Sequence, residues 1–273
     1  MMNFALLFRN YGILLGTILL FVILAVSADG FATERNLRNI LDQQSMVIIA
    51  ASFMTIAIIS GNFDVSVSAV FVTAPLFGLR VENMTGNVFL AVAAALAVGL
   101  LMGAINGFIV TRLKINSFIG TLATSFMFFG AGFLVSSRSL MRPESDVYRL
   151  IARSRFLGLT SATWIAIAVV IIATILLSRT RFGRNVFAVG GNMEAARLAG
   201  VAVNRVQTTA FLLLGVAAAL AGVLNSSRSI SAQPSDDFSF VFAVLTAVIV
   251  GGTSIAGGQG AIWRTTTAAF FLA

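Results

Sequence analysis

The sequence has no cysteine and no histidine among its 273 residues. Without cysteine the chain forms no disulfide and offers no thiolate to a metal, and without histidine it lacks the commonest metal ligand and general base. We therefore expect no metal site and no triad-type hydrolysis. A membrane-embedded hydrolase would lack both its base and its metal ligands.

Charged residues are scarce as well. They make up 10% of the chain and hydrophobic residues 58%, whereas soluble domains typically carry about 25% charged residues. This composition excludes a soluble globule and predicts a membrane protein. The net charge is +8, and all basic residues except Lys114 are arginines spread along loops. Such a distribution suits anionic lipid headgroups, and because no base-reading motif is present we expect no nucleic-acid partner.

Apolar runs of membrane-spanning length predict an all-α polytopic membrane protein with about eight complete transmembrane helices, forming a single domain over 1–273. The expected crossings are 11–27, 45–60, 65–79, 88–110, 117–135, 157–178, 209–225 and 238–250. Residues 29–44 are expected to form an amphipathic helix at the membrane interface. A ninth span begins after Arg264 and is cut short at Ala273, so we expect the chain to be truncated. A cleavable signal peptide ending near Ala28 is the competing interpretation of the first span.

Two of the expected crossings are interrupted. One is broken at Gly61-Asn62 and carries Pro75, so residues 65–79 are expected to be kinked or re-entrant, with 80–87 returning to water. The other is broken by a glycine-rich stretch containing Gly251, Gly252, Gly257 and Gly258. No lysine follows these glycines, which argues against nucleotide binding there. A pair of broken segments in the two halves of a chain points to a transport site or gate.

Polar residues beside these breaks are candidates for a translocation path. Asp64 either caps the segment that follows or lines the path. Asn106 lies on or beside a stripe of Gly99, Gly103 and Gly107 that predicts a central packing helix. Within 117–135, the hydroxyls of Thr121 and Thr124 and the ring of Phe126 match the mixed surface of a sugar, although a core or lipid-facing role suits the aromatic residues equally well.

The longest polar stretch is 180–207, in which Glu194 is the only acid among several arginines. Because each charge in hydrocarbon would cost roughly 2.5 to 3.5 kcal/mol, this stretch must lie outside the bilayer. Gly190-Gly191-Asn192 is a turn signal. Asn192 is a plausible N-cap and Gly200 a plausible C′ residue, so we expect a short helix over 193–198. A solvated connector is the simpler alternative to a docking helix.

The residues of this stretch resemble those of a known protein family. Glu194-Ala195-Ala196 followed by Gly200 resembles the EAA-type loop of ABC importer permeases, and FGRNVFAVGGNMEAARLAG resembles its sugar-type branch. Segments 61–69, 105–124 and 248–263 resemble three further signatures of that family, in the family's order.

The resemblance implies a transport subunit rather than an enzyme. It would move a monosaccharide or related small polar solute across the bacterial inner membrane, with Glu194, Ala195, Ala196, Arg197 and Gly200 contacting a separate cytoplasmic ATP-binding subunit. ATP would bind to that subunit and no cofactor to this chain. The other implied partners are a periplasmic or lipid-anchored solute-binding protein and a second permease copy. The resemblance also implies a cytoplasmic position for 180–207. The positive-inside rule does not decide this orientation, because the basic residues divide evenly between the two sides.

A self-contained secondary carrier or channel is the alternative function. A proton-coupled carrier normally has ionisable residues in mid-span, and here Asp64 is the only acid expected near a crossing. This scarcity favours an externally powered subunit. Which solute is moved is not determined by the sequence.

Overall fold

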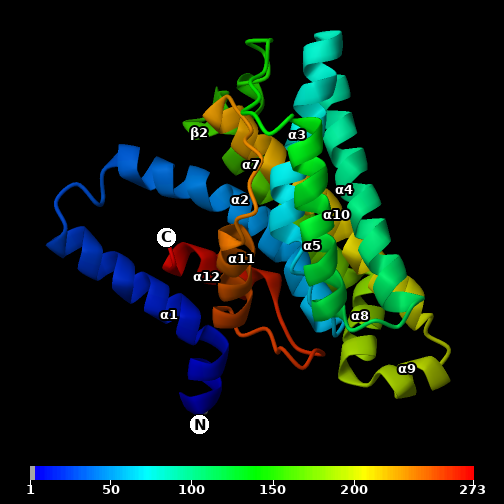
Figure 1. The fold of residues 1–273 in the computed structure, drawn as a ribbon. Coiled ribbons are helices and arrows are strands. Elements are labelled where there is room, and N and C mark those ends of the chain that lie inside the picture. The colour runs from blue at the N-terminus through cyan, green and yellow to red at the C-terminus, as the bar shows by residue number, and fades with distance from the viewer. Residues whose placement is uncertain (1–3) are drawn as a thin grey trace.

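The computed structural model describes residues 4–273, and it is an all-α protein apart from one small hairpin (Figure 1). Two strands, β1 (Arg155–Phe156) and β2 (Leu159–Thr160), pair antiparallel. The helices are α1 (Phe4–Ser27), α2 (Glu34–Ile59), α3 (Val67–Thr85), α4 (Val88–Thr111), α5 (Ser117–Val135), α6 (Leu150–Arg153), α7 (Ser161–Arg179), α8 (Arg181–Gly191), α9 (Met193–Leu198), α10 (Val203–Ser229), α11 (Ser239–Val250) and α12 (Ile262–Phe271).

Five of these helices, α2, α4, α5, α7 and α10, are long and apolar enough to cross a membrane. Residues 11–27 of α1 and the whole of α11 are shorter apolar helices. The chain is therefore a multi-pass, all-α membrane protein, as the composition predicted. Length and composition alone do not establish a total of eight or nine crossings.

Helices α2 and α10 form the centre of the bundle. Helix α10 packs against α2, α3 and α4, and α2 also packs against α7, α11 and α12. In Figure 1, α3, α4, α5 and α10 stand together, whereas α1 lies apart and meets the rest at α12.

The glycine stripe of α4 makes the close contact that its spacing predicted. A Cβ at Gly99 would lie 2.5 Å from the Gly215 carbonyl oxygen, and one at Gly103 would lie 2.4 Å from that of Phe211. The stripe therefore lets α4 approach α10 at backbone distance. The central position expected for α4 was wrong, because α10 occupies the centre and α4 packs on α10, α3 and α5 from the outside, with most of its length not buried.

Three boundary predictions were also wrong. Residues 34–44 are not a separate interfacial helix but the first part of α2. Helix α3 runs without interruption through Pro75 to Thr85, so the helix does not end where 80–87 was expected to begin, although residues 84–87 are exposed. Residues 181–191 form α8, where the glycines had indicated only a turn.

Glu82 explains why α3 can continue past its polar residues. Its side chain is fully buried, and its two carboxylate oxygens accept the backbone N–H groups of Glu144 and Ser145 at 2.9 and 2.8 Å. A buried acid in a helix was not expected from the sequence. The contact fastens the loop 136–160 to α3, and a hydrogen bond between Tyr148 and Ser226 fastens the same loop to α10.

The bundle has two distinct ends. Helices α8 and α9 lie at one, which we call the α9 end, and the loop 136–160 lies at the other, which we call the loop end (Figure 1). The loop 136–160 and helices α8 and α9 therefore lie at opposite ends of the bundle.

Candidate functional site

Four of the predicted path residues meet in one buried polar network between α3, α4 and α5. Asp64, Asn106, Thr121 and Thr124 are each no more than 2% exposed. The Asn106 amide nitrogen donates to both Asp64 oxygens, at 3.4 and 3.3 Å, and its carbonyl oxygen accepts from the Thr124 hydroxyl at 2.7 Å. Residues from the break before α3, from α4 and from α5 thus form one continuous hydrogen-bonded chain.

Ser66 completes this network. Ser66 donates its backbone N–H and its hydroxyl to one Asp64 oxygen, at 2.8 and 2.6 Å, and its hydroxyl accepts from Asn106 at 2.6 Å. Asp64 therefore forms a turn with Ser66, which is the N-cap of α3, and accepts none of the free N–H groups of the described helix itself; its role in the path stays a prediction. Among the described residues, no cation lies in ion-pair range of Asp64.

The break between α2 and α3 is held from α5. The backbone N–H groups of Phe63 and Val65, which no helix satisfies, donate to the hydroxyls of Ser117 and Thr121 at 3.0 and 2.9 Å. Irregular backbone inside a membrane protein persists only where such partners exist. Ser117 and Thr121 therefore stabilise the first interrupted segment.

Both interruptions begin with the same helix ending. Gly61 and Gly252 adopt left-handed backbone angles, with φ of 85° and 78°. After α2, Gly61 donates to Ile58 and Asn62 to Ala57; after α11, Gly252 and Thr253 donate to Ile249 and Val248. These are the paired hydrogen bonds of a Schellman motif, which closes a helix and turns the chain away from it.

The glycine-rich stretch then meets the end of α2 and α8 in a three-way contact that we call the glycine junction, formed by Ile59, Gly190, Gly257 and Gly258. The Gly258 N–H donates to the Ile59 carbonyl at 2.9 Å. A Cβ at Gly190 would lie 1.6 Å from that same carbonyl oxygen and 2.6 Å from the Gly258 nitrogen. Only glycine fits at position 190.

Helix α9 has the ends that the sequence predicted. Asn192 accepts the Ala195 N–H through its side chain at 2.9 Å, and Gly200, at φ 83°, closes the helix. Glu194 and Arg197 form an exposed ion pair at 3.0 Å. Ala195 is exposed and Ala196 is buried. The resemblance implied that both alanines contact a partner, but only Ala195 is accessible for such a contact.

Phe126 does not join the network. It is 60% exposed on α5 and meets the ring of Phe238 edge to face, with the centroids 5.8 Å apart.

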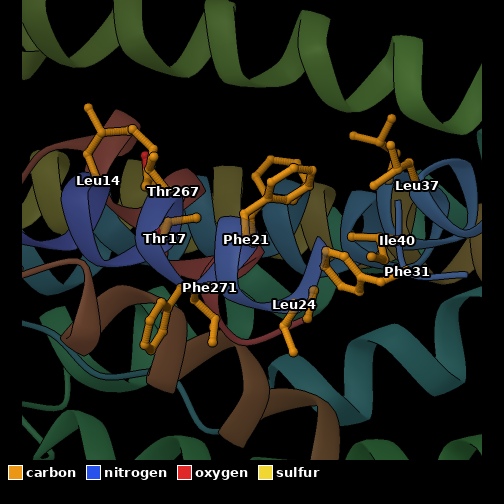
Figure 2. A pocket seen from close by; sticks show the side chains of 14 residues that line it. Leu14, Thr17, Phe21, Leu24, Phe31, Leu37, Ile40, Thr267 and Phe271 are labelled. Atoms are coloured by element: carbon orange, nitrogen blue, oxygen red, sulfur yellow. The ribbon is translucent and has the colours of Figure 1, made fainter. Parts of the chain in front are cut away.

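A hollow between α1, α2 and α12 is also separate from the network. It measures about 550 Å³ (Figure 2). Apart from Thr17 and Thr267 its labelled side chains are apolar, and those two hydroxyls donate to the carbonyls of Ile13 and Trp263 within their own helices. It offers a polar solute few hydrogen-bond partners.

Sequence reasoning missed Gly190 and Ser66. Gly190 was interpreted as a turn, and only its neighbour across the junction shows why it must be glycine. Ser66 carried a weak signal, since it follows Asp64 at the two-residue spacing of an Asx-type turn.

Comparison with known proteins shows the family to which this chain belongs. The family model described as the permease component of branched-chain amino acid transport systems matches residues 36–271. No solved structure matches the chain significantly.

Three curated relatives illustrate the match. The L-arabinose transport system permease protein AraH of Escherichia coli K12 is 36% identical over 95% of this chain and 79% of its own length. The ribose import permease protein RbsC of the same organism is 34% identical over 95% and 82%. The L-arabinose ABC transporter permease protein AraH of Azospirillum brasilense is 31% identical over 94% and 76%. The chain therefore belongs to the family of transport-system permease components, and it is similar to the sugar ABC importer permeases within it.

Proposed function

We propose that this chain is the membrane subunit of an ABC importer for a monosaccharide or a related small polar solute, with energy supplied by a separate ATP-binding subunit. The observation that carries the proposal is the exposed, capped helix α9 joined through α8 to the glycine junction. A docking helix that is connected directly to two broken membrane segments is suited to a subunit whose energy comes from ATP hydrolysis on another protein. The sugar class rests on the named relatives, which import arabinose and ribose.

The arrangement in the membrane follows from this assignment. Residues 1–273 form one permease domain in the bacterial inner membrane, with α9 as a cytoplasmic coupling helix. The helices make eight crossings, and α12 begins a ninth. ATP binds to the partner subunit, and this chain needs no cofactor of its own.

Three protein partners are proposed. The ATP-binding subunit docks on α9, where Glu194, Ala195 and Leu198 are exposed. The periplasmic or lipid-anchored solute-binding protein docks at the loop end. A second permease copy lies on the other side of the translocation path. We include it because the polar groups of the network are hydrogen-bonded within one copy, which leaves no open path through a single chain.

We propose the buried polar network as the closed part of that path. Its hydroxyl, amide and carboxylate groups are those that exchange hydrogen bonds with a sugar, and they lie at the first break. In this conformation the network is satisfied internally and excludes solute. Opening therefore requires α3, α4 and α5 to separate locally.

Binding of the ATP-binding subunit tests the proposal. We expect Glu194→Ala and Gly200→Val to reduce its recovery in a pull-down and to abolish uptake. Glu194 also pairs with Arg197, and an exposed pair of this kind stabilises a fold by only about 0 to 1 kcal/mol. A desolvated pair with the partner would be worth about 2 to 5 kcal/mol, so a large loss of affinity identifies the partner contact.

Gly86→Val is the matched control for Gly200→Val. Gly86 has a φ of 66° at the end of α3, and like Gly200 it has nothing within 4 Å of a built Cβ. Both changes strain one left-handed residue, but only Gly200 lies beside α9. Normal recovery and uptake with both α9 variants would make the stretch a simple connector, and uptake without any ATPase would favour a secondary carrier.

A further inference from the structure

Basic side chains gather around a hollow at the α9 end, where three segments distant in the sequence meet. The hollow measures about 500 Å³ and is lined by residues from the turn after α4, from α9 and from the start of α10. Arg112, Lys114, Arg197 and Arg205 all line it, and no acidic side chain does. Lys114 is fixed there by a 3.1 Å hydrogen bond to Asn204.

Three of these four charges are free to bind an anion. Arg197 pairs with Glu194, but within residues 4–273 neither Arg112, Lys114 nor Arg205 forms an ion pair. All three side chains belong to exposed residues. Like charges that gather without a counter-charge repel one another, so an anion in the hollow would stabilise this arrangement.

A second hollow continues from the first along the outside of α4 and α10. It measures about 350 Å³, shares Arg112, Asn204 and Arg205 with the first, and extends to Ala104 and Phe108. Phe108 is 55% exposed, and Leu101, two turns before it on α4, is 61% exposed. The two hollows therefore run from a cationic recess to an apolar face of α4, a helix long and apolar enough to cross a membrane.

We propose that these joined hollows bind one anionic phospholipid, with its phosphate held by Arg112, Lys114 and Arg205 and one acyl chain lying along Ala104 and Phe108. Basic recesses between membrane helices are suited to such headgroups. The apolar continuation distinguishes this ligand from a free phosphate, which has no tail to bury.

Lipid titration of the purified protein in neutral detergent tests the proposal. We expect phosphatidylglycerol to bind more tightly than phosphatidylcholine, and this preference to weaken with added salt. In Arg112→Gln/Lys114→Gln/Arg205→Gln the affinity for phosphatidylglycerol should fall about 100-fold. This estimate takes roughly 1 kcal/mol for each basic residue at an anionic surface and 1.4 kcal/mol for each factor of ten.

Arg179→Gln/Arg181→Gln/Arg184→Gln is the matched control. It removes the same charge from exposed positions near the same end, and none of the three lines either hollow. It should retain the preference of the wild type. Equal losses in both triple variants, or no preference for phosphatidylglycerol in the wild type, would overturn the proposal whether or not the first variant folds.

Two further measurements distinguish a phospholipid from other ligands of this recess. Inorganic phosphate or a headgroup without tails that competes as strongly as the whole lipid would assign the recess to a free anion. Unchanged lipid binding together with lost recovery of the ATP-binding subunit would assign the three charges to that protein. Either result contradicts a lipid site, and neither contradicts the docking of the ATP-binding subunit on α9.

Discussion

At the scale of single residues, position 190 is the most constrained in the α9 end. A side chain there meets backbone on two sides, from Ile59 and Gly258. Neither neighbour is a flexible side chain that could rotate away. The constraint therefore concerns the distance between three backbones.

We expect Gly190→Ala to force this junction apart. Overpacking of a buried contact typically costs about 1 to 3 kcal/mol, which exceeds the roughly 0.5 to 1 kcal/mol that alanine gains over glycine within a helix. Thermal unfolding of the purified permease should show the loss, and uptake should fall with it.

Gly191→Ala is the control for that change. It is the next residue of α8, and a Cβ there meets nothing within 4 Å. Its stability should match or slightly exceed that of the wild type. Equal effects from the two substitutions would show that helix propensity, and not the junction, governs this position.

At the scale of elements, the two interrupted segments differ in their exposure. Val65 is buried in the polar network, whereas Ala256 is exposed in the turn between α11 and α12. One break is therefore closed in this conformation while the other is open to solvent.

Single cysteines can report this difference, because the chain has none of its own. In the permease alone, we expect a small aqueous thiol reagent to label Ala256→Cys rapidly and Val65→Cys hardly at all. Labelling of Val65→Cys should rise when the ATP-binding subunit cycles. If it stays unlabelled in every nucleotide state, the network is structural and lies off the path.

The elements also show what local sequence could and could not predict. The ends of α9 were predicted because Asn192 and Gly200 act on neighbouring backbone. The length of α3 was not, because Glu82 is satisfied by a distant loop. The path residues were predicted as separate polar positions, and their joining through Ser66 required the three-dimensional fold.

At the scale of the whole molecule, the α9 end and the loop end define two faces. Ala195 and Ser139 are exposed at these respective ends. The topology expected from the sequence divides the basic residues evenly between the two sides, so charge alone does not orient the chain.

Labelling from one side of the membrane tests the orientation. An impermeant maleimide added to intact spheroplasts should label Ser139→Cys and leave Ala195→Cys untouched until the membrane is opened. The reverse pattern would invert the topology and remove α9 from the reach of a cytoplasmic ATPase.

The glycine junction has a thermodynamic consequence for the proposed transport subunit. Because the Gly258 to Ile59 hydrogen bond and the Gly190 contact join three segments at backbone distance, a shift of α8 is transmitted to both breaks. Linkage then works in both directions and by equal factors. A solute that tightened ATPase binding tenfold would itself be held tenfold more tightly when the ATPase is bound, a mutual dependence of about 1.4 kcal/mol.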